Sequence, residues 1–251
     1  MTAIARLTSA ELRKLATTPA FLITLAVAVV IDVLSVVVDA AVAGKNGQAP
    51  LGTTASTDQM LKLGAVCCVA MLALGIVASG GEYRHRTIIP AMLVAPRRAT
   101  LVVAKTLALV VAGVVVAGLT FGLGLATIVI ELNAHGFDQL PPGTARLFAD
   151  SVIAAILLGL VGVALGYITR STTAAVVGAV GWVLFVELAI LHTVAPQLYK
   201  WLITGASTAL TDPTAQGGNN LAPLAAIAVL GVYALVLLAV ATQLVLRRDV
   251  A

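Results

Sequence analysis

The sequence predicts an all-α membrane protein with six transmembrane helices. Of its 251 residues, 60% are hydrophobic and only 10% are charged, whereas a soluble domain carries about 25% charged residues. The mean hydropathy is +1.07, and a soluble chain this apolar could not cover its own surface. Six stretches are apolar over the roughly 20 residues that a helix needs to cross the bilayer core. Because they are continuously apolar rather than alternating, they predict helices and not barrel strands.

The predicted spans share a long apolar run with few or no charges, and they cover residues 21–43, 61–81, 101–130, 148–169, 172–192 and 221–246. Short connections take up most of what is left, so we predict a single transmembrane domain, 1–251, with no soluble catalytic domain. The first run is longer than the roughly 7–15 residues of a signal-peptide core. It also contains Asp32 and Asp39. We therefore expect an uncleaved span.

The distribution of Lys and Arg predicts the orientation. An even number of spans puts both termini on one side, together with eleven of the fifteen basic residues, and leaves four on the other. Basic residues concentrate on the cytoplasmic side. We therefore predict cytoplasmic termini in a cell (plasma or inner) membrane. The net charge of +4 reflects this bias and does not indicate nucleic-acid binding.

The connections predict three further helices. Residues 1–19 form a basic segment in which Thr8 and Glu11 are spaced as a capping box, so we predict an amphipathic elbow helix on the inner leaflet. The loop 82–100 carries the largest polar stretch on the inside, and we predict a short cytoplasmic helix there. The outer loop 193–220 contains Tyr199 and Trp201, and aromatic residues of this kind predict a short interfacial helix before the last span.

Charge begins abruptly at the end of the second span. The segment reads Glu82, Tyr83, Arg84, His85, Arg86 and Thr87. A helix in this loop would present a polar face to a partner protein, with Glu82 pairing with Arg84 or Arg86 or capping backbone amides. The same residues also suit a simple contact between basic side chains and anionic lipid, and both interpretations stay open.

This segment, followed by Pro96-Arg97-Arg98 and Lys105, resembles the first cytoplasmic loop of the permeases of type-2 class ABC exporters, most closely the small actinobacterial six-span permeases. The six-span layout, the basic elbow and the long last outer loop fit the same family over essentially the whole chain. The resemblance implies a coupling helix that contacts an ATPase subunit through residues 82–87. In this chain His85 and Arg86 precede Thr87, where many relatives have Gly.

The resemblance also implies the assembly and its function. Two copies of an ATPase subunit would bind ATP and Mg, and a second copy of this permease, or a similar one, would complete the translocation path. The complex would be an efflux system for an amphipathic or lipid-like substrate, such as a drug, antibiotic, peptide or lipid. The chain itself would be no enzyme and would hold no cofactor. It has no G-x-x-x-x-G-K-[ST] phosphate loop.

Carboxylates within spans are costly and are functional candidates. Asp32 and Asp39 are seven residues apart on one helical face, with Ser35 between them, and Glu187 lies in the fifth span. They fit a polar translocation path, a proton relay or a structural contact between helices. The three histidines lie in different connections, and the adjacent Cys67 and Cys68 suit burial rather than a disulfide, so we expect no metal site.

Two small-xxx-small patterns, Gly118/Gly122 and Gly162/Gly166, predict close helix packing within the subunit. Two other functions remain open. The intramembrane carboxylates Asp32, Asp39 and Glu187 would suit a proton-coupled secondary transporter, although no broken helices occur at matched positions in two halves. The second open function is that of a non-transporting anchor subunit. A membrane-embedded enzyme would need His, Asp or Ser clustered at one depth, which the sequence does not have.

Overall fold

The computed structural model describes residues 3–45, 47–85, 87, 98–137, 140–215 and 220–247, and no strand occurs in these ranges. The helices are α1 (Ala3–Thr17), α2 (Pro19–Val42), α3 (Thr54–Met60), α4 (Gly64–Arg84), α6 (Arg98–Ala134), α7 (Thr144–Thr169), α8 (Thr172–Gly181), the π-helix η1 (Trp182–Leu191), α9 (His192–Val194), α10 (Pro196–Tyr199), α11 (Ile203–Thr211), the short 3₁₀ turn η2 (Pro213–Ala215) and α12 (Pro223–Arg247).

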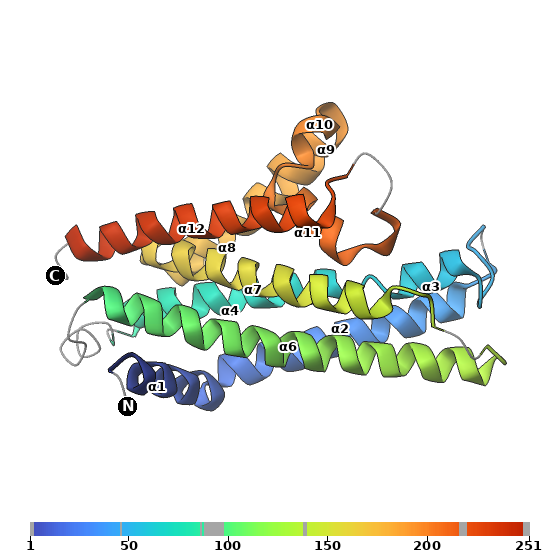
Figure 1. Cartoon of the computed structure of the whole chain (residues 1–251), viewed down its shortest axis with the longest axis horizontal. Helices are drawn as coiled ribbons and strands as arrows, with labels where there is room; N and C mark the ends of the chain where they lie inside the picture. Colours follow the sequence, from blue (N-terminus) through green and yellow to red (C-terminus); the bar gives the residue numbers. More distant parts are fainter. Residues whose placement is uncertain are drawn as a thin grey trace.

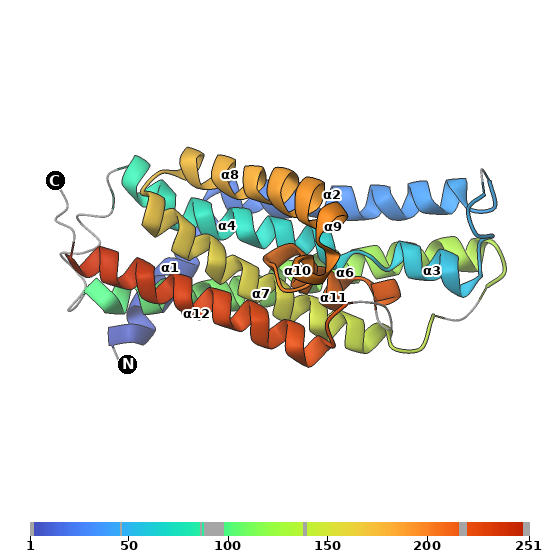
Figure 2. The ribbon, with the colours of Figure 1, turned by 90° about the horizontal axis from the view of Figure 1, so that it is seen from above.

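Five segments are long and apolar enough to cross a bilayer, and they are Pro19–Val42, Thr54–Arg84, Ala99–Ala134, Thr144–Thr169 and Pro223–Arg247. Their helices run side by side along the long axis of the molecule (Figures 1 and 2). Both chain ends and the C-terminus of α4 lie at one end of this bundle, which we call the terminal end (Figure 1). The predicted class, a multi-pass helical membrane protein, is supported; the side that the terminal end faces stays a prediction.

The predicted fifth span, 172–192, is not one long α-helix. It consists of α8, ten residues long, and then η1, a π-helix of ten residues. A π-helix has i→i+5 backbone hydrogen bonds, so residues five apart lie on successive turns. Here the indole N–H of Trp182 donates a hydrogen bond to Glu187 Oε1 at 2.7 Å. Five of the six predicted spans therefore occur as long helices, while a crossing by α8 and η1 remains a prediction.

A helix does occur at the N-terminus, but the predicted capping box does not. Because α1 begins at Ala3, Thr8 and Glu11 lie inside it. Glu11 is buried, and its carboxylate contacts Lys105 of α6 rather than the backbone at the helix start. The role of α1 as an elbow on the membrane surface stays a prediction.

The connections that are predicted to lie outside contain short helices, one of which the sequence did not predict and one of which differs from the prediction. The Gly- and Thr-rich stretch after the first span contains α3, whose start is capped by Thr53, since its hydroxyl accepts the Ser56 N–H at 3.3 Å. In place of one interfacial helix around Tyr199 and Trp201, α10 ends at Tyr199 and α11 begins at Ile203. Buried small residues of α11 pack into the main core, so α11 belongs to the bundle.

The core forms around the crossing of α4 and α7, where glycines allow the backbones to approach closely. A Cβ added to Gly75 would clash with the backbone oxygen of Gly159, and one added to Gly162 would clash with that of Leu72. Gly166 meets α4 in the same way, at Ser79 and Gly80. The predicted packing role of Gly162 and Gly166 is therefore confirmed.

The second small-xxx-small pattern does not pack within the described part of the chain. A Cβ added to Gly118 or Gly122 of α6 would meet no atom within 4 Å among the described residues. For the described residues, the prediction that this pair packs inside the subunit is therefore wrong. No described helix covers this face of α6 at the two glycines.

Gly75→Ala should destabilise the fold by about 1–3 kcal/mol, the usual cost of overpacking, because the backbone of α7 cannot move away without disturbing the whole crossing. Gly122→Ala on α6 is the matched control and should leave stability unchanged or slightly raised, since Ala is the better helix former. Thermal unfolding of both variants in detergent micelles measures the difference. Equal melting temperatures would show that the α4–α7 crossing is looser than described.

Candidate functional site

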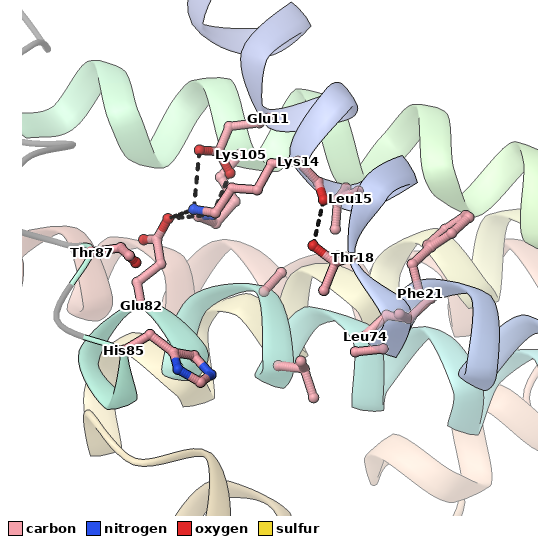
Figure 3. Close-up of a pocket in the computed structure, with 14 residues that line it drawn as sticks. Glu11, Lys14, Leu15, Thr18, Phe21, Leu74, Glu82, His85, Thr87 and Lys105 are labelled. Carbon is pink, nitrogen blue, oxygen red and sulfur yellow. Dashed lines mark hydrogen bonds and ion pairs between the residues drawn. The ribbon is translucent and has the colours of Figure 1, made fainter.

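Four charged side chains from three helices meet at the terminal end (Figure 3). Lys105 of α6 contacts Glu11 of α1 and lies 3.1 Å from Glu82 Oε1 of α4. Lys14 of α1 contacts the same oxygen of Glu82 and lies 3.7 Å from Glu11. Each carboxylate thus faces both ammonium groups. We call these four residues the charge cluster.

The charge cluster is buried on all but one side. The side chains of Lys105 and Glu82 are each 1% exposed and that of Glu11 is 10% exposed, whereas Lys14 is 42% exposed. A buried charge is tolerated only when it is paired and hydrogen-bonded, and removing one partner of a buried pair costs several kcal/mol. The two negative charges of the Glu side chains balance the two positive charges of the Lys side chains. Each residue therefore depends on the others to remain charged and buried.

The cluster explains why α1 docks on the bundle. A helix of fifteen residues is marginal in water without tertiary contacts. Here α1 is joined to α4 and α6 through Glu11 and Lys14, and Leu15 packs against the core. The Thr18 hydroxyl donates to the Lys14 carbonyl oxygen at the turn into α2. The charge cluster therefore ties the start of the chain to the end of α4.

The carboxylates hold Lys14 in its charged form. Burial lowers the pKa of an ammonium group, but the attraction and hydrogen bonds of Glu82 and Glu11 outweigh burial and raise the pKa of Lys14 above its usual 10.5. A basic group with a raised pKa stabilises the fold below its ordinary pKa, and this contribution is lost as the pH rises through the raised value. Lys14 therefore remains cationic at physiological pH.

A cavity of about 290 Å³ adjoins the charge cluster. Its lining combines the four charged residues with His85 and Thr87 on one side and apolar side chains of α1, α2 and α4 on the other, among them Leu15, Phe21 and Leu74. Figure 3 shows these groups around the cavity. This part of the molecule thus offers a pocket that is charged at one end and apolar at the other.

The residues predicted to contact an ATPase separate into a buried and an exposed set. Glu82 lies within the last turn of α4 and contacts Lys14 and Lys105 instead of Arg84. By contrast, Arg84, His85 and Thr87 are exposed at the terminal end. Arg86 and residues 88–97, where the coupling helix is predicted, lie outside the described residues. The Thr87 N–H donates to the Glu82 carbonyl at 2.9 Å, which places Thr87 next to the cluster.

Tyr83 connects the end of α4 to the turn between α7 and α8. Its ring meets that of Tyr167 edge-on, with centroids 6.3 Å apart, and the Arg170 guanidinium lies 5.6 Å from its centre. Both contacts are favourable for an electron-rich ring. The last turn of α4 is therefore fixed from two sides, by the charge cluster and by this aromatic contact.

Asp32, Ser35 and Asp39 do not form one polar surface. Asp32 is fully buried, and neither of its carboxylate oxygens has a hydrogen-bond partner among the described residues. Ser35 is exposed and donates to the Asp32 carbonyl within its own helix at 2.8 Å. Asp39 lies two turns further, half-buried. The described residues contain no group of three His, Cys, Asp or Glu that could hold a metal ion.

Glu187 is fully buried and has a partner for each oxygen. Oε1 accepts the Trp182 indole N–H, and Oε2 accepts the backbone N–H of Thr204 at 2.8 Å. Thr204 lies in the first turn of α11, where backbone N–H groups need acceptors and a negative charge is favourable. Glu187 therefore joins η1 to the start of α11, and this geometry supports the structural interpretation for Glu187.

The partners of Glu82 do not follow from the sequence patterns. Lys105 was considered only as part of the loop motif and Glu11 only as part of a capping box, and neither pattern predicts a contact with Glu82. One signal could have identified Glu11, because it is the only acidic residue in the first 31. A lone carboxylate in a basic, amphipathic segment indicates a specific partner. The pairing itself depends on how α1 folds back, which no local pattern encodes.

No protein-family model and no curated protein matches this chain.

Lys105→Met should destabilise the fold by on the order of 3–5 kcal/mol, because it removes the buried ammonium and leaves two carboxylates with only the more exposed Lys14 as a partner. Adding Glu11→Gln should recover part of this loss, with a coupling energy of about 1–3 kcal/mol. Denaturant titration in mixed micelles measures the free energy of unfolding of the wild type, both single variants and the double variant. Arg13→Gln on the exposed side of α1 is the control and should change stability by less than about 0.5 kcal/mol. Strictly additive effects of the two cluster substitutions would contradict a shared ion pair.

Proposed function

We propose that this chain is the membrane-spanning permease subunit of an ATP-driven ABC exporter. Two copies of a separate ATPase subunit would bind ATP and Mg, and a second permease would complete the path for an amphipathic or lipid-like substrate. The proposal rests on the resemblance of residues 82–87 and the six-span layout to that family. The long apolar helices are compatible with it.

The observation that supports it best is the construction of the terminal end. Three predicted contact residues, Arg84, His85 and Thr87, are exposed where α4 ends, and Glu82, one turn away or less, joins that end to α1 and α6. A push on the exposed residues would therefore move three helices together. This is what a device that converts ATPase closure into rearrangement of the spans requires.

The six predicted contact residues then have separate roles. Glu82 and Tyr83 act as positioning residues, because both are held inside the molecule by α1, α6 and α7. Arg84, His85 and Thr87 would contact the ATPase directly, together with Arg86. Since positive side chains dominate this set, the complementary surface on the partner would be acidic.

A proton-coupled secondary transporter is the second candidate, and one observation favours it. Asp32 is buried without a hydrogen-bond partner among the described residues, which is costly unless the residue has a function. Glu187 does not strengthen this candidate, because both its oxygens accept structural hydrogen bonds. Asp32→Asn distinguishes the two functions: it would abolish transport that follows a pH gradient and leave ATP-driven transport largely in place.

The proposal predicts that the tagged chain, purified from native membranes in mild detergent, carries a subunit that is labelled by a photoreactive ATP analogue. Arg84→Glu should lower the recovered amount of this subunit about tenfold or more, because like charges across an interface cost several kcal/mol. Arg13→Glu makes the same charge change on the exposed side of α1 and should leave recovery unchanged.

Three outcomes would contradict the proposal. One is a chain that carries no ATP-labelled subunit while transport persists after ATP depletion and follows the pH gradient. The second is equal recovery of that subunit with Arg84→Glu and wild type. The third is equal loss with Arg13→Glu, which would show a general effect of charge on insertion and not a contact at the end of α4.

A further inference from the structure

The cavity beside the charge cluster crosses the predicted membrane boundary. Its apolar wall is formed by Phe21 in the first turn of α2 and by Leu74, Val77 and Ala78 of α4. These belong to two of the three membrane-crossing segments that border the cavity, and the third contributes Lys105. Its polar wall is formed at the ends of these segments by Glu82 and Lys105, and on α1 by Glu11 and Lys14. A molecule that fills this cavity must therefore be apolar in its inner part and polar at its outer end.

The size of the cavity restricts the apolar part of a ligand to a single hydrocarbon chain. At about 290 Å³ it lies just below the range for ligand pockets, roughly 300–1,000 Å³. A folded, drug-sized molecule would not be enclosed by it. A narrow hydrocarbon segment would be enclosed, because it could lie between Phe21 and Leu74 with its end near the charge cluster.

The charge around the polar wall favours an anionic head group. Both acidic residues of this region, Glu11 and Glu82, already face two ammonium groups. Lys14 remains 42% exposed, and an ammonium has three donors, so it can bind a further oxygen. The other charged side chains described on α1 and at the end of α4 are all basic, and they are Arg6, Arg13 and Arg84.

We propose that this cavity binds one acyl chain of an anionic phospholipid from the adjacent leaflet, with the phosphate of the head group at Lys14. The chain lies against Phe21, Leu74 and Ala78. The bound lipid fills the space between α1 and α4, so the docking of α1 depends on the anionic lipid of that leaflet. This site is independent of the proposed transport function.

The test uses phosphatidylglycerol with a photoreactive diazirine in the middle of one acyl chain. The full-length protein is placed in phosphatidylcholine nanodiscs that contain this probe, irradiated and digested, and the labelled peptides are identified by mass spectrometry. We expect label on residues 15–21 and 74–78. Unlabelled phosphatidylglycerol should compete for this label, and additional phosphatidylcholine should not.

Two Ala→Phe substitutions on α4 form a matched pair. Ala78→Phe fills the cavity and should lower this label about tenfold, because each buried methylene contributes about fourfold to binding. Ala73→Phe is the control: Ala73 is also half-buried on α4 but borders the separate apolar groove between α2 and α4. It should leave the label unchanged. Lys14→Gln combined with Glu11→Gln keeps the charge cluster neutral, with Lys105 still paired to Glu82, and should keep the label but remove the preference for phosphatidylglycerol.

Equal labelling of wild type and Ala78→Phe would overturn the proposal, as would label confined to the groove near Ala73. Stronger competition by oleate than by phosphatidylglycerol would also overturn it, because it would identify a free anionic amphiphile as the ligand. Should Ala78→Phe fail to fold, the competition series on wild type and the lost head-group preference of the charge-balanced double variant, Lys14→Gln with Glu11→Gln, decide the question.

Discussion

The arrangement of the terminal end depends on the pairing of two carboxylates with two ammonium groups where α1, α4 and α6 meet. Glu82 and Lys105 are both almost inaccessible to solvent, and neither could stay at that depth alone. Their presence fixes Glu11 and Lys14 beside them, and through these residues the whole of α1. A short helix that would otherwise be marginal thereby becomes part of the bundle, and a cavity remains between it and α4.

Two further contacts make the end of α4 a junction. Tyr83 packs against Tyr167 and Arg170, so the turn from α7 to α8 is held by the same turn of helix as the charge cluster. Below it, the glycines of α4 and α7 bring these helices together over most of their length. A displacement of the exposed residues Arg84 and His85 would therefore be passed to a rigid pair of helices. The proposed coupling to an ATPase and the proposed lipid site both act on this junction, one from outside the bilayer and one from its boundary.

Much of the architecture follows from the sequence because a bilayer reduces the problem to length and polarity. Five long helices lie where the apolar runs predict them, and the close approach at Gly162 and Gly166 was visible as a motif. The same rules failed where a polar group has a distant partner. Glu11 was interpreted by its spacing to Thr8, yet it pairs with Lys105, 94 residues away. For Glu187 the sequence left functional and structural interpretations open, and only its partners on η1 and α11 favour the structural one. Gly118 shows a different limit of the sequence. Its small-xxx-small motif permits close helix packing, but the motif does not say which helix, if any, packs there.

Hydrogen–deuterium exchange of α1 in nanodiscs tests the role of the charge cluster most directly. If Glu11 and Lys14 tie α1 to the bundle, the amides of α1 exchange as slowly as those in the last turn of α4, and Lys105→Met speeds the exchange of α1 while the α4–α7 crossing stays protected. Fast exchange of α1 in the wild-type protein, at the rate of an undocked peptide, would contradict this role. Unchanged protection of α1 in Lys105→Met would contradict it as well.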